Sequence, residues 1–265
     1  MASLMQALHN PSLLNSSTKS VMFSTSSLMA KKKVQDCWVP ICGVVIRRIR
    51  PDDPREKCRV TNFLKNNLFS DDPLMIAAGL HRNDPDPGLI QYYTKCINEN
   101  NSLYALVQNT KEIIGACVNR KGTPRTAAEL KRAAKGMVYQ QTSRYLELIS
   151  TAEERISVYN SYDVKEGLSI ECLVTGREFR QRGIAKLMLK AVLDMTKGDG
   201  RFPLIKFMTA NTHGGHAAHA CGGMRLHASR NPIEYRNDKG EQFIYDELPL
   251  PHKNLETFVA ILKKK

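Results

Sequence analysis

Residues 168–195 read LSIECLVTGREFRQRGIAKLMLKAVLDM. The first part, Leu168–Val174, is an apolar run of the length of a strand. A polar turn follows, and from Ile184 onward the apolar residues recur at the spacing of one face of a helix. The stretch therefore predicts a strand, a turn and an amphipathic helix in direct succession.

The turn reads RQRGIA over residues 180–185 and has the properties of an anion site. A helix start offers free backbone N–H groups and the positive end of the helix dipole. Gly183 and Ala185 leave the backbone open to close approach, while Arg180 and Arg182 add positive charge. Phosphate groups favour this combination. An ordinary tight connection would contain the same glycine, so the turn alone leaves both interpretations open.

Strand and helix patterns alternate over the rest of the chain. We expect strands over Ile41–Ile49, Leu103–Val107, Ile113–Val118, Pro203–Met208, Ile233–Tyr235, Gln242–Tyr245 and Leu255–Leu262. We expect helices after the Pro51–Pro54 turn and over Leu89–Ile97, Ala127–Leu148 and Thr212–Gly223. Two of the strands flank a short polar turn and predict a hairpin. This mixture, with a strand–helix–strand unit, is typical of the α/β or α+β class.

The composition excludes several kinds of partner. The chain of 265 residues has a formal net charge of +13, which either spreads over solvated faces or attracts phosphates such as those of coenzyme A. It contains neither zinc-finger spacing nor the aromatic strand of RNA-binding domains, so we expect no nucleic-acid partner. No apolar stretch approaches the ~18–20 residues that cross a bilayer, so we expect no membrane partner.

The seven cysteines form an odd set without C-x-x-C spacing. This pattern is typical of a reduced intracellular protein that uses cysteine as a small apolar residue. It favours a cytoplasmic location.

The first residues differ in composition from the rest. Met1–Gln35 contains no Asp or Glu, is rich in Ser, and carries only lysine charges. Such a composition fits either a disordered N-terminal extension or a mitochondrial transit peptide. We therefore expect residues 1–36 to lie outside the fold and residues 37–265 to form a single domain.

The phosphate-type turn has the form R-x-x-G-x-A between a strand and an amphipathic helix, which is the acetyl-coenzyme A pyrophosphate motif of the Gcn5-related N-acetyltransferases (GNAT superfamily). From about Ile41 to Lys265 the chain resembles these proteins, specifically the insect-type arylalkylamine N-acetyltransferases. The sequence FSDDPL at residues 69–74 is similar to the Asp-Glu-Pro-Leu motif of that branch. Further similar segments are IRRIRPDD at 46–53, EIIGACVN at 112–119, FPLIK at 202–206, YRNDKG at 235–240 and PLPH at 249–252.

The resemblance implies a fold and a cofactor site. The expected fold is a mixed central sheet of six to seven strands flanked by helices, with acetyl-CoA in the cleft at the fourth and fifth strands. Backbone groups near the end of the fourth strand would bind the pantetheine arm and the thioester carbonyl, and the turn would hold the pyrophosphate. The residues so implied are Leu173, Val174, Thr175, Arg180, Gln181, Arg182, Gly183, Ile184, Ala185 and Lys186.

The resemblance also implies catalytic candidates. Asp72 takes the position of the branch's glutamate, thought to deprotonate the amine, and is one methylene shorter. Branch members have serines where this chain has residues 211–215, so Asn211, Thr212 and His213 become the candidates for assisting the leaving thiolate. The chemistry needs such groups because an alkylamine is protonated at neutral pH and the thioester carbonyl gains negative charge.

Three histidines, His213, His216 and His219, recur every third residue. They form either a metal-binding helix face or the polar rim of an active site. Because no carboxylate or C-x-x-C pair accompanies them, the rim is favoured and no metal is expected.

Three functions follow from these observations. The first is an acetyl-CoA-dependent N-acetyltransferase, an acyltransferase that acts on a small primary amine of the dopamine, tryptamine or serotonin type. The second is a transferase with a different acceptor, a polyamine or a protein amine; the basic surface disfavours a polyamine. The third is a paralogue that binds acetyl-CoA but has lost catalysis. For each, a monomer is expected.

Overall fold

The structure is a computed structural model that describes residues 37–41, 43–82 and 84–262, all within one compact unit. Its strands are β1 Cys37–Ile41, β2 Val44–Arg48, β3 Leu103–Val107, β4 Ile113–Gly122, β5 Gly167–Thr175, β6 Leu204–Thr209, β7 Arg225–Arg230 and β8 Leu255–Ile261. Its α-helices are α1 Pro54–Asn67, α2 Pro73–Ala77, α3 Pro87–Asn98, α4 Thr126–Ala134, α5 Gln140–Ile156, α6 Val158–Ser161, α7 Ile184–Asp199 and α8 Thr212–Ala220. Short 3₁₀ turns are η1 Leu80–Arg82, η2 Arg177–Phe179 and η3 Pro232–Glu234.

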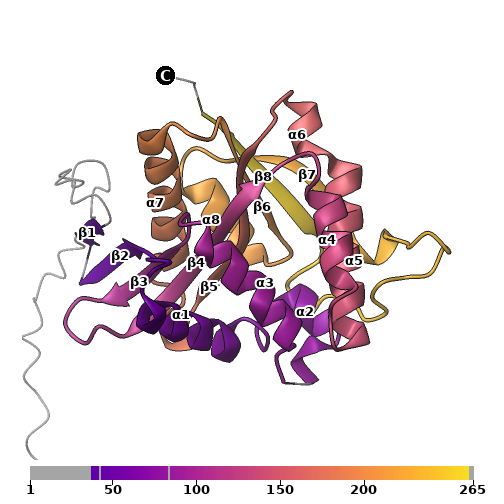
Figure 1. Cartoon of the computed structure of the whole chain (residues 1–265), viewed down its shortest axis with the longest axis horizontal. Coiled ribbons are helices and arrows are strands. Elements are labelled where there is room, and N and C mark those ends of the chain that lie inside the picture. The colour runs from indigo at the N-terminus through magenta and orange to yellow at the C-terminus, as the bar shows by residue number, and fades with distance from the viewer. Residues whose placement is uncertain (1–36, 42, 83, 263–265) are drawn as a thin grey trace, which may run out of the picture. The chain divides into compact units, whose positions relative to one another are not determined.

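One sheet of eight strands, in the order β1-β2-β3-β4-β5-β6-β8-β7, runs through the described part of the chain (Figure 1). Neighbouring strands are antiparallel except for β5 and β6, which pair in parallel from Leu168↔Ile205 to Ile170↔Phe207. Beyond that pair β5 continues to Thr175 without a partner on its β6 side, although β4 still pairs with its other edge. The two strands therefore diverge and open a cleft in the sheet.

Helices cover both faces of this sheet. Helices α1 to α5 pack on one face in a core that includes Leu64, Tyr93 and Leu148. Helices α7 and α8 pack on the other face, where Met188 and Phe258 are completely buried. Each fully buried apolar side chain of this size contributes roughly 1.5–3 kcal/mol, so the two layers hold the diverging strands from both sides.

The structure confirms the strand–turn–helix unit and the mixed fold class. The fourth and fifth predicted strands are β5 and β6, and α1 begins after Asp53, whose side chain accepts hydrogen bonds from two backbone N–H groups of the helix. The sheet has eight strands, one or two more than the six to seven expected. The single strand expected over Ile41–Ile49 contains the last residue of β1, a turn at Gly43 with φ +76°, and β2, so β1 was not predicted as a separate strand.

Two other predictions are wrong. The helix expected over Ala127–Leu148 is two helices, α4 and α5, because the chain turns at Gly136, where a glycine weakens a continuous helix. The strands expected over Ile233–Tyr235 and Gln242–Tyr245 are a 3₁₀ turn started by Pro232 and a segment that makes one isolated bridge, Arg236↔Gln242. The strand that pairs with β8 at this edge of the sheet is β7, which was not predicted because its sequence RLHASR has little apolar periodicity.

No helix in the described part of the chain is long and apolar enough to span a membrane.

Residues 1–36, for which a disordered extension or a transit peptide is predicted, lie outside the described residues. From their composition we predict that a protein starting at Asp36 keeps the melting temperature and the activity of the full chain. Calorimetric scans and activity assays of both lengths test this. A lower melting temperature in the shorter protein would show that the segment contributes to the fold.

Candidate active site

The turn between β5 and α7 presents an uncapped helix start. Gln181 and Gly183 have positive φ angles of 60° and 76°, and no side chain in the described part of the chain caps the helix. The first helical hydrogen bond runs from the Leu187 N–H to the Gly183 carbonyl, at 3.0 Å. The backbone N–H groups of residues 184–186 are therefore free at the positive end of α7, beside the exposed Arg180 and Arg182. The geometry is that of an anion site.

Asp71 ties this turn to the loop before α2. Its carboxylate accepts hydrogen bonds from Arg177 Nε at 3.0 and 3.1 Å and also pairs with the guanidinium of Arg180. Burial opposes ionisation of this carboxyl, but hydrogen bonds from Arg177, Ser70 and Arg180 hold its pKa below the ordinary value. The sequence alone does not identify this contact, because nothing local connects Asp71 to arginines more than a hundred residues away.

A cavity of about 750 Å³ begins at this turn and passes between the diverging ends of β5 and β6. It joins the predicted cofactor and catalytic residues in one space. Of the fourteen candidates, twelve line it: Asp72, Leu173, Val174, Thr175, Arg180, Gln181, Gly183, Ile184, Ala185, Lys186, Asn211 and His213. The other two are Arg182, whose guanidinium lies 5.4 Å from the centre of the Phe179 ring, and Thr212.

Asp72 lies in the wall of this cavity at the start of α2. Its Oδ1 accepts hydrogen bonds from the N–H groups of Leu74 at 3.0 Å and Met75 at 2.9 Å. Its other oxygen accepts none of the hydrogen bonds found among the described residues, and no basic side chain there pairs with it. Burial raises the pKa of Asp72, with the two backbone hydrogen bonds acting in the opposite direction. One oxygen thus caps the helix and leaves the other for chemistry.

Tyrosines and apolar side chains surround Asp72. Tyr92 and Tyr93 on α3 contact each other edge to face, with ring centres 5.5 Å apart, and Tyr145 on α5 completes the aromatic wall. Burial raises the pKa values of Tyr93 and Tyr145 well above the ordinary value, and the nearby charge of Asp72 adds to this. These hydroxyls therefore stay neutral. The apolar part of the wall is Leu68, Leu74, Met75, Leu130, Leu146 and Ile149.

The opposite wall contains the start of α8. Asn211 caps that helix, since its side-chain oxygen accepts hydrogen bonds from the N–H groups of His213 at 2.9 Å and Gly214 at 3.3 Å. The Thr212 N–H donates to His252 Nδ1 at 3.1 Å. A neutral ring that accepts at Nδ1 carries its proton on Nε2, so His252 is a hydrogen-bond donor at the cavity wall. Sequence reasoning gave His252 no role, although Pro249–His252 was among the segments carrying the resemblance.

The histidines do not form a metal site in the described part of the chain, where no group of three or more potential ligands occurs. The His213 ring lies 6.4 Å from that of His216 and 5.9 Å from that of His252, centre to centre. His219 instead packs edge-on against Phe258, at 5.0 Å.

We predict that His252→Ala lowers kcat by about tenfold, the value of one lost hydrogen bond. Burial and the neighbouring His213 lower the pKa of His252, so the ring is neutral at neutral pH and donates through Nε2. Steady-state kinetics test this. His219→Gln is the matched control, because His219 does not line the cavity. Equal kcat values for the wild type and His252→Ala would leave His252 without a catalytic role.

Comparison with known proteins gives a likeness of structure only. No protein-family model and no curated protein sequence matches the chain. A solved agmatine N-acetyltransferase covers 83% of this chain and 100% of its own, at 20% identity and a TM-score of 0.72. A mosquito arylalkylamine N-acetyltransferase like 5b covers the same shares, at 17% identity and 0.74.

A polyamine N-acetyltransferase of Drosophila melanogaster, described as catalysing the formation of N-acetylagmatine, also covers 83% of this chain and 100% of its own, at 19% identity and a TM-score of 0.72. At these identities the likeness establishes the fold. The protein has the fold of the Gcn5-related N-acetyltransferases, as its sequence predicts.

Proposed function

We propose that the protein transfers the acetyl group of acetyl-CoA to a small primary amine, with Asp72 as the general base. One observation carries this proposal. One cavity joins a helix start beside two arginines, suited to phosphates, to a buried carboxylate that has no basic partner among the described residues, suited to an ammonium group.

The residues present fit acetyl-CoA, which supplies the acyl group as a thioester. The free N–H groups after Gly183, with Arg180 and Arg182, would hold the pyrophosphate. Backbone groups of Leu173–Thr175, on the edge of β5 that faces away from β4, would hold the pantetheine arm. Asp71 keeps Arg180 close to the loop that carries Asp72, so the two halves of the site are connected.

The proposed transfer then requires few steps from the protein. Asp72 accepts a proton from the ammonium group and frees the nitrogen lone pair. As the new N–C bond forms and the C–S bond breaks, the second proton of the nitrogen passes to the departing sulfur, and the proton held by Asp72 is released to solvent. His252 donates a hydrogen bond through Nε2–H to the sulfur as its negative charge develops.

The acceptor we propose is an arylalkylamine. Three tyrosines and six apolar side chains form the wall around Asp72, which suits a flat apolar body with an amine at one end. Solved proteins of this fold include arylalkylamine enzymes as well as agmatine and polyamine enzymes. The aromatic wall favours the former for this chain.

A thiol-release assay with acetyl-CoA and a panel of primary amines tests the proposal. We expect release that depends on the amine and is fastest with phenethylamine-type acceptors. If acetyl-CoA binds in calorimetry but no amine is acetylated, the protein is a cofactor-binding paralogue without catalysis. If acetyl-CoA does not bind, the proposal fails entirely.

A further inference from the structure

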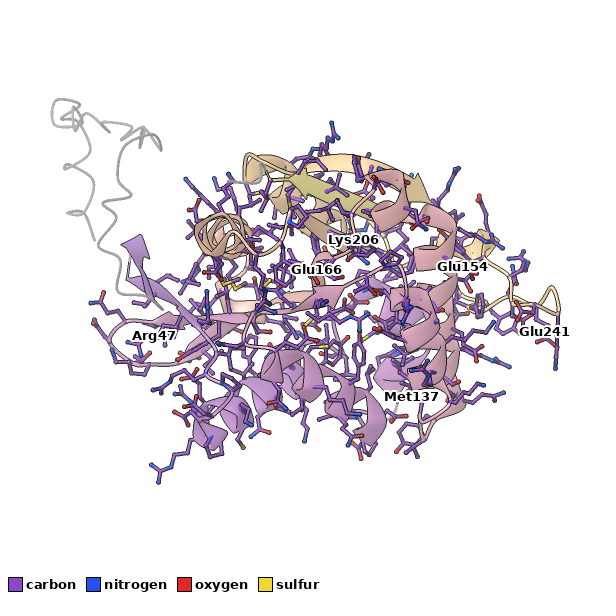
Figure 2. The ribbon with its side chains drawn as sticks, turned by 45° about the horizontal axis from the view of Figure 1, so that its top comes forward. Arg47, Met137, Glu154, Glu166, Lys206 and Glu241 are labelled. Carbon is purple, nitrogen blue, oxygen red and sulfur yellow. The ribbon has the colours of Figure 1, made fainter. Side chains whose placement is uncertain are left out.

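The part of the cavity proposed to bind the acceptor amine contains two charged side chains, Glu153 and Glu171, which form what is called its floor here. Glu171 on β5 and Glu153 on α5 line it, and each carboxylate has a basic partner behind it. Arg120 Nε donates to Glu171 at 3.2 Å, and Lys206 pairs with Glu153. Lys206 is 1% exposed and lies among the side chains of the interior in Figure 2.

A β-bulge sets the position of Glu171. Val118 and Asn119 are neighbours on β4, yet they pair with Cys172 and Ile170 on β5, so Glu171 is the extra residue. Bulges re-aim side chains and are common beside active sites. The Glu171 side chain is 10% exposed, and it lines the cavity on the same side as Tyr92.

The carboxylates that line the cavity differ in their partners. Three of the four have basic partners: Asp71 with Arg177 and Arg180, Glu153 with Lys206, and Glu171 with Arg120, an arginine that Glu171 shares with Glu129. Asp72 is the fourth and has no basic partner in the described part of the chain. Among the described lining residues, Asp72 is therefore the carboxylate best placed to compensate a cation, the ammonium that reacts.

Glu171 nevertheless retains capacity for a hydrogen bond. Burial opposes its ionisation, but the charges of Arg120 and Lys206 and hydrogen bonds from Tyr92 and Ser169 hold its pKa below the ordinary value. The Tyr92 hydroxyl donates at 2.5 Å and Arg120 at 3.2 Å. An ionised carboxylate has about four acceptor positions, so these two donors leave room for a group in the cavity.

We propose that Glu171 is a specificity-determining residue that accepts a hydrogen bond from an uncharged donor, such as a hydroxyl, at the end of the acceptor remote from its amine. A second cation at that end would compete with Arg120 and Lys206 for these carboxylates, so an uncharged donor is favoured there. This inference rests on the proposed acetyl transfer and names the acceptor class more narrowly.

Three matched amines test it on the full-length wild type: phenethylamine, tyramine and the para-amidino analogue of phenethylamine. They differ only in the remote group, which is absent, hydroxyl or cationic. We expect kcat/KM for tyramine to exceed that for phenethylamine by about tenfold or more, because hydrogen bonds to charged groups are the stronger ones. We expect the amidino analogue to fall below phenethylamine. Equal values for phenethylamine and tyramine, or a preference for the cation, overturn the inference but leave the proposed function standing. No acetylation of any amine overturns both.

A pair of variants assigns the effect to Glu171. Glu171→Met removes the acceptor at similar length and leaves Arg120 paired with Glu129, so no buried charge is orphaned. It should reduce the tyramine advantage about tenfold with little change in kcat/KM for phenethylamine. Glu129→Gln is the control, because Glu129 contacts the same arginine, at 3.1 Å, but does not line the cavity. An unchanged tyramine advantage in Glu171→Met, or an equal loss in Glu129→Gln, contradicts the assignment.

Discussion

Replacing Asp72 with asparagine should lower kcat by about 10²–10⁴-fold, the range that a positioned general base contributes. Asparagine is also a good N-cap, so it can keep the hydrogen bonds to Leu74 and Met75 while losing the basic oxygen. Affinity for acetyl-CoA should stay close to that of the wild type, since the proposed phosphate contacts lie at residues 180–186. Steady-state kinetics and calorimetry measure the two quantities separately.

The pH dependence of the reaction rate gives a second test of Asp72 as the general base. A base must be ionised to act, and burial raises the pKa of Asp72, so the wild-type rate should fall as the pH decreases through that raised value. This acidic limb should be absent in Asp72→Asn. The free energy of unfolding changes with pH in the opposite direction, because the folded state holds the Asp72 proton more tightly than the unfolded state. Protonation of Asp72 stabilises the fold fully below the unfolded pKa of about 3.9, and this stabilisation is lost as the pH rises through the folded pKa.

A matched control is available for this variant. Asp53 also caps a helix immediately before a proline, with its Oδ1 accepting from the N–H groups of Arg55 at 3.0 Å and Glu56 at 3.1 Å, but it does not line the cavity. Asp53→Asn should therefore leave kcat unchanged. Asp72→Glu should keep activity or raise it, because the longer side chain reaches further into the cavity. A wild-type rate and pH profile in Asp72→Asn would remove Asp72 from the mechanism.

Replacing Gly183 with valine should weaken acetyl-CoA binding by at least about 100-fold, comparable to the cost of misplacing a reacting group by 1 Å. Gly183 has φ +76°, which is unfavourable for a β-branched residue, and its backbone would be the closest approach of the phosphates. A Cβ there would meet no protein atom within 4 Å. The variant should therefore fold, with its side chain standing in front of the free N–H groups.

Gly200→Val is the control that separates the effect of backbone strain from the effect on acetyl-CoA binding. Gly200 has φ +63°, ends the same helix, and also has open space around it. This variant should lose a similar amount of stability, but its dissociation constant for acetyl-CoA should match the wild type. Unchanged affinity in a folded Gly183→Val protein would mean that the cofactor site lies elsewhere.

The parts of the fold that could be predicted are those that local sequence determines. Strand β5, its turn and α7 follow from an apolar run, a glycine and a helical period within 28 residues. The caps at Asp53 and Asp72 are equally local, because each aspartate precedes a proline at the helix start. The break at Gly136 and the edge strand β7 were missed because propensity is weak there and tertiary pairing decides the outcome.

The residues of the candidate site also fall into those that local sequence predicts and those that it does not. The phosphate turn and Asp72 stand in recognisable short motifs. Other contacts join segments from 51 to 109 residues apart, and no periodicity in the sequence predicts them. They are the ion pair between Asp71 and Arg180 and the hydrogen bonds of Glu171 with Arg120 and Tyr92. The bulge at Glu171 depends on the register with β4, so the strand pattern alone indicates only an apolar strand with one charged residue.

Mass spectrometry of a complete reaction distinguishes acetyl transfer from hydrolysis of the cofactor. The purified full-length protein is incubated with acetyl-CoA and tyramine, and the products are identified by mass spectrometry, with Asp72→Asn in parallel. We expect N-acetyltyramine together with an equal amount of free coenzyme A, formed at a rate that falls sharply in the variant. Free coenzyme A without an acetylated amine, or N-acetyltyramine at the same rate with both proteins, would contradict it.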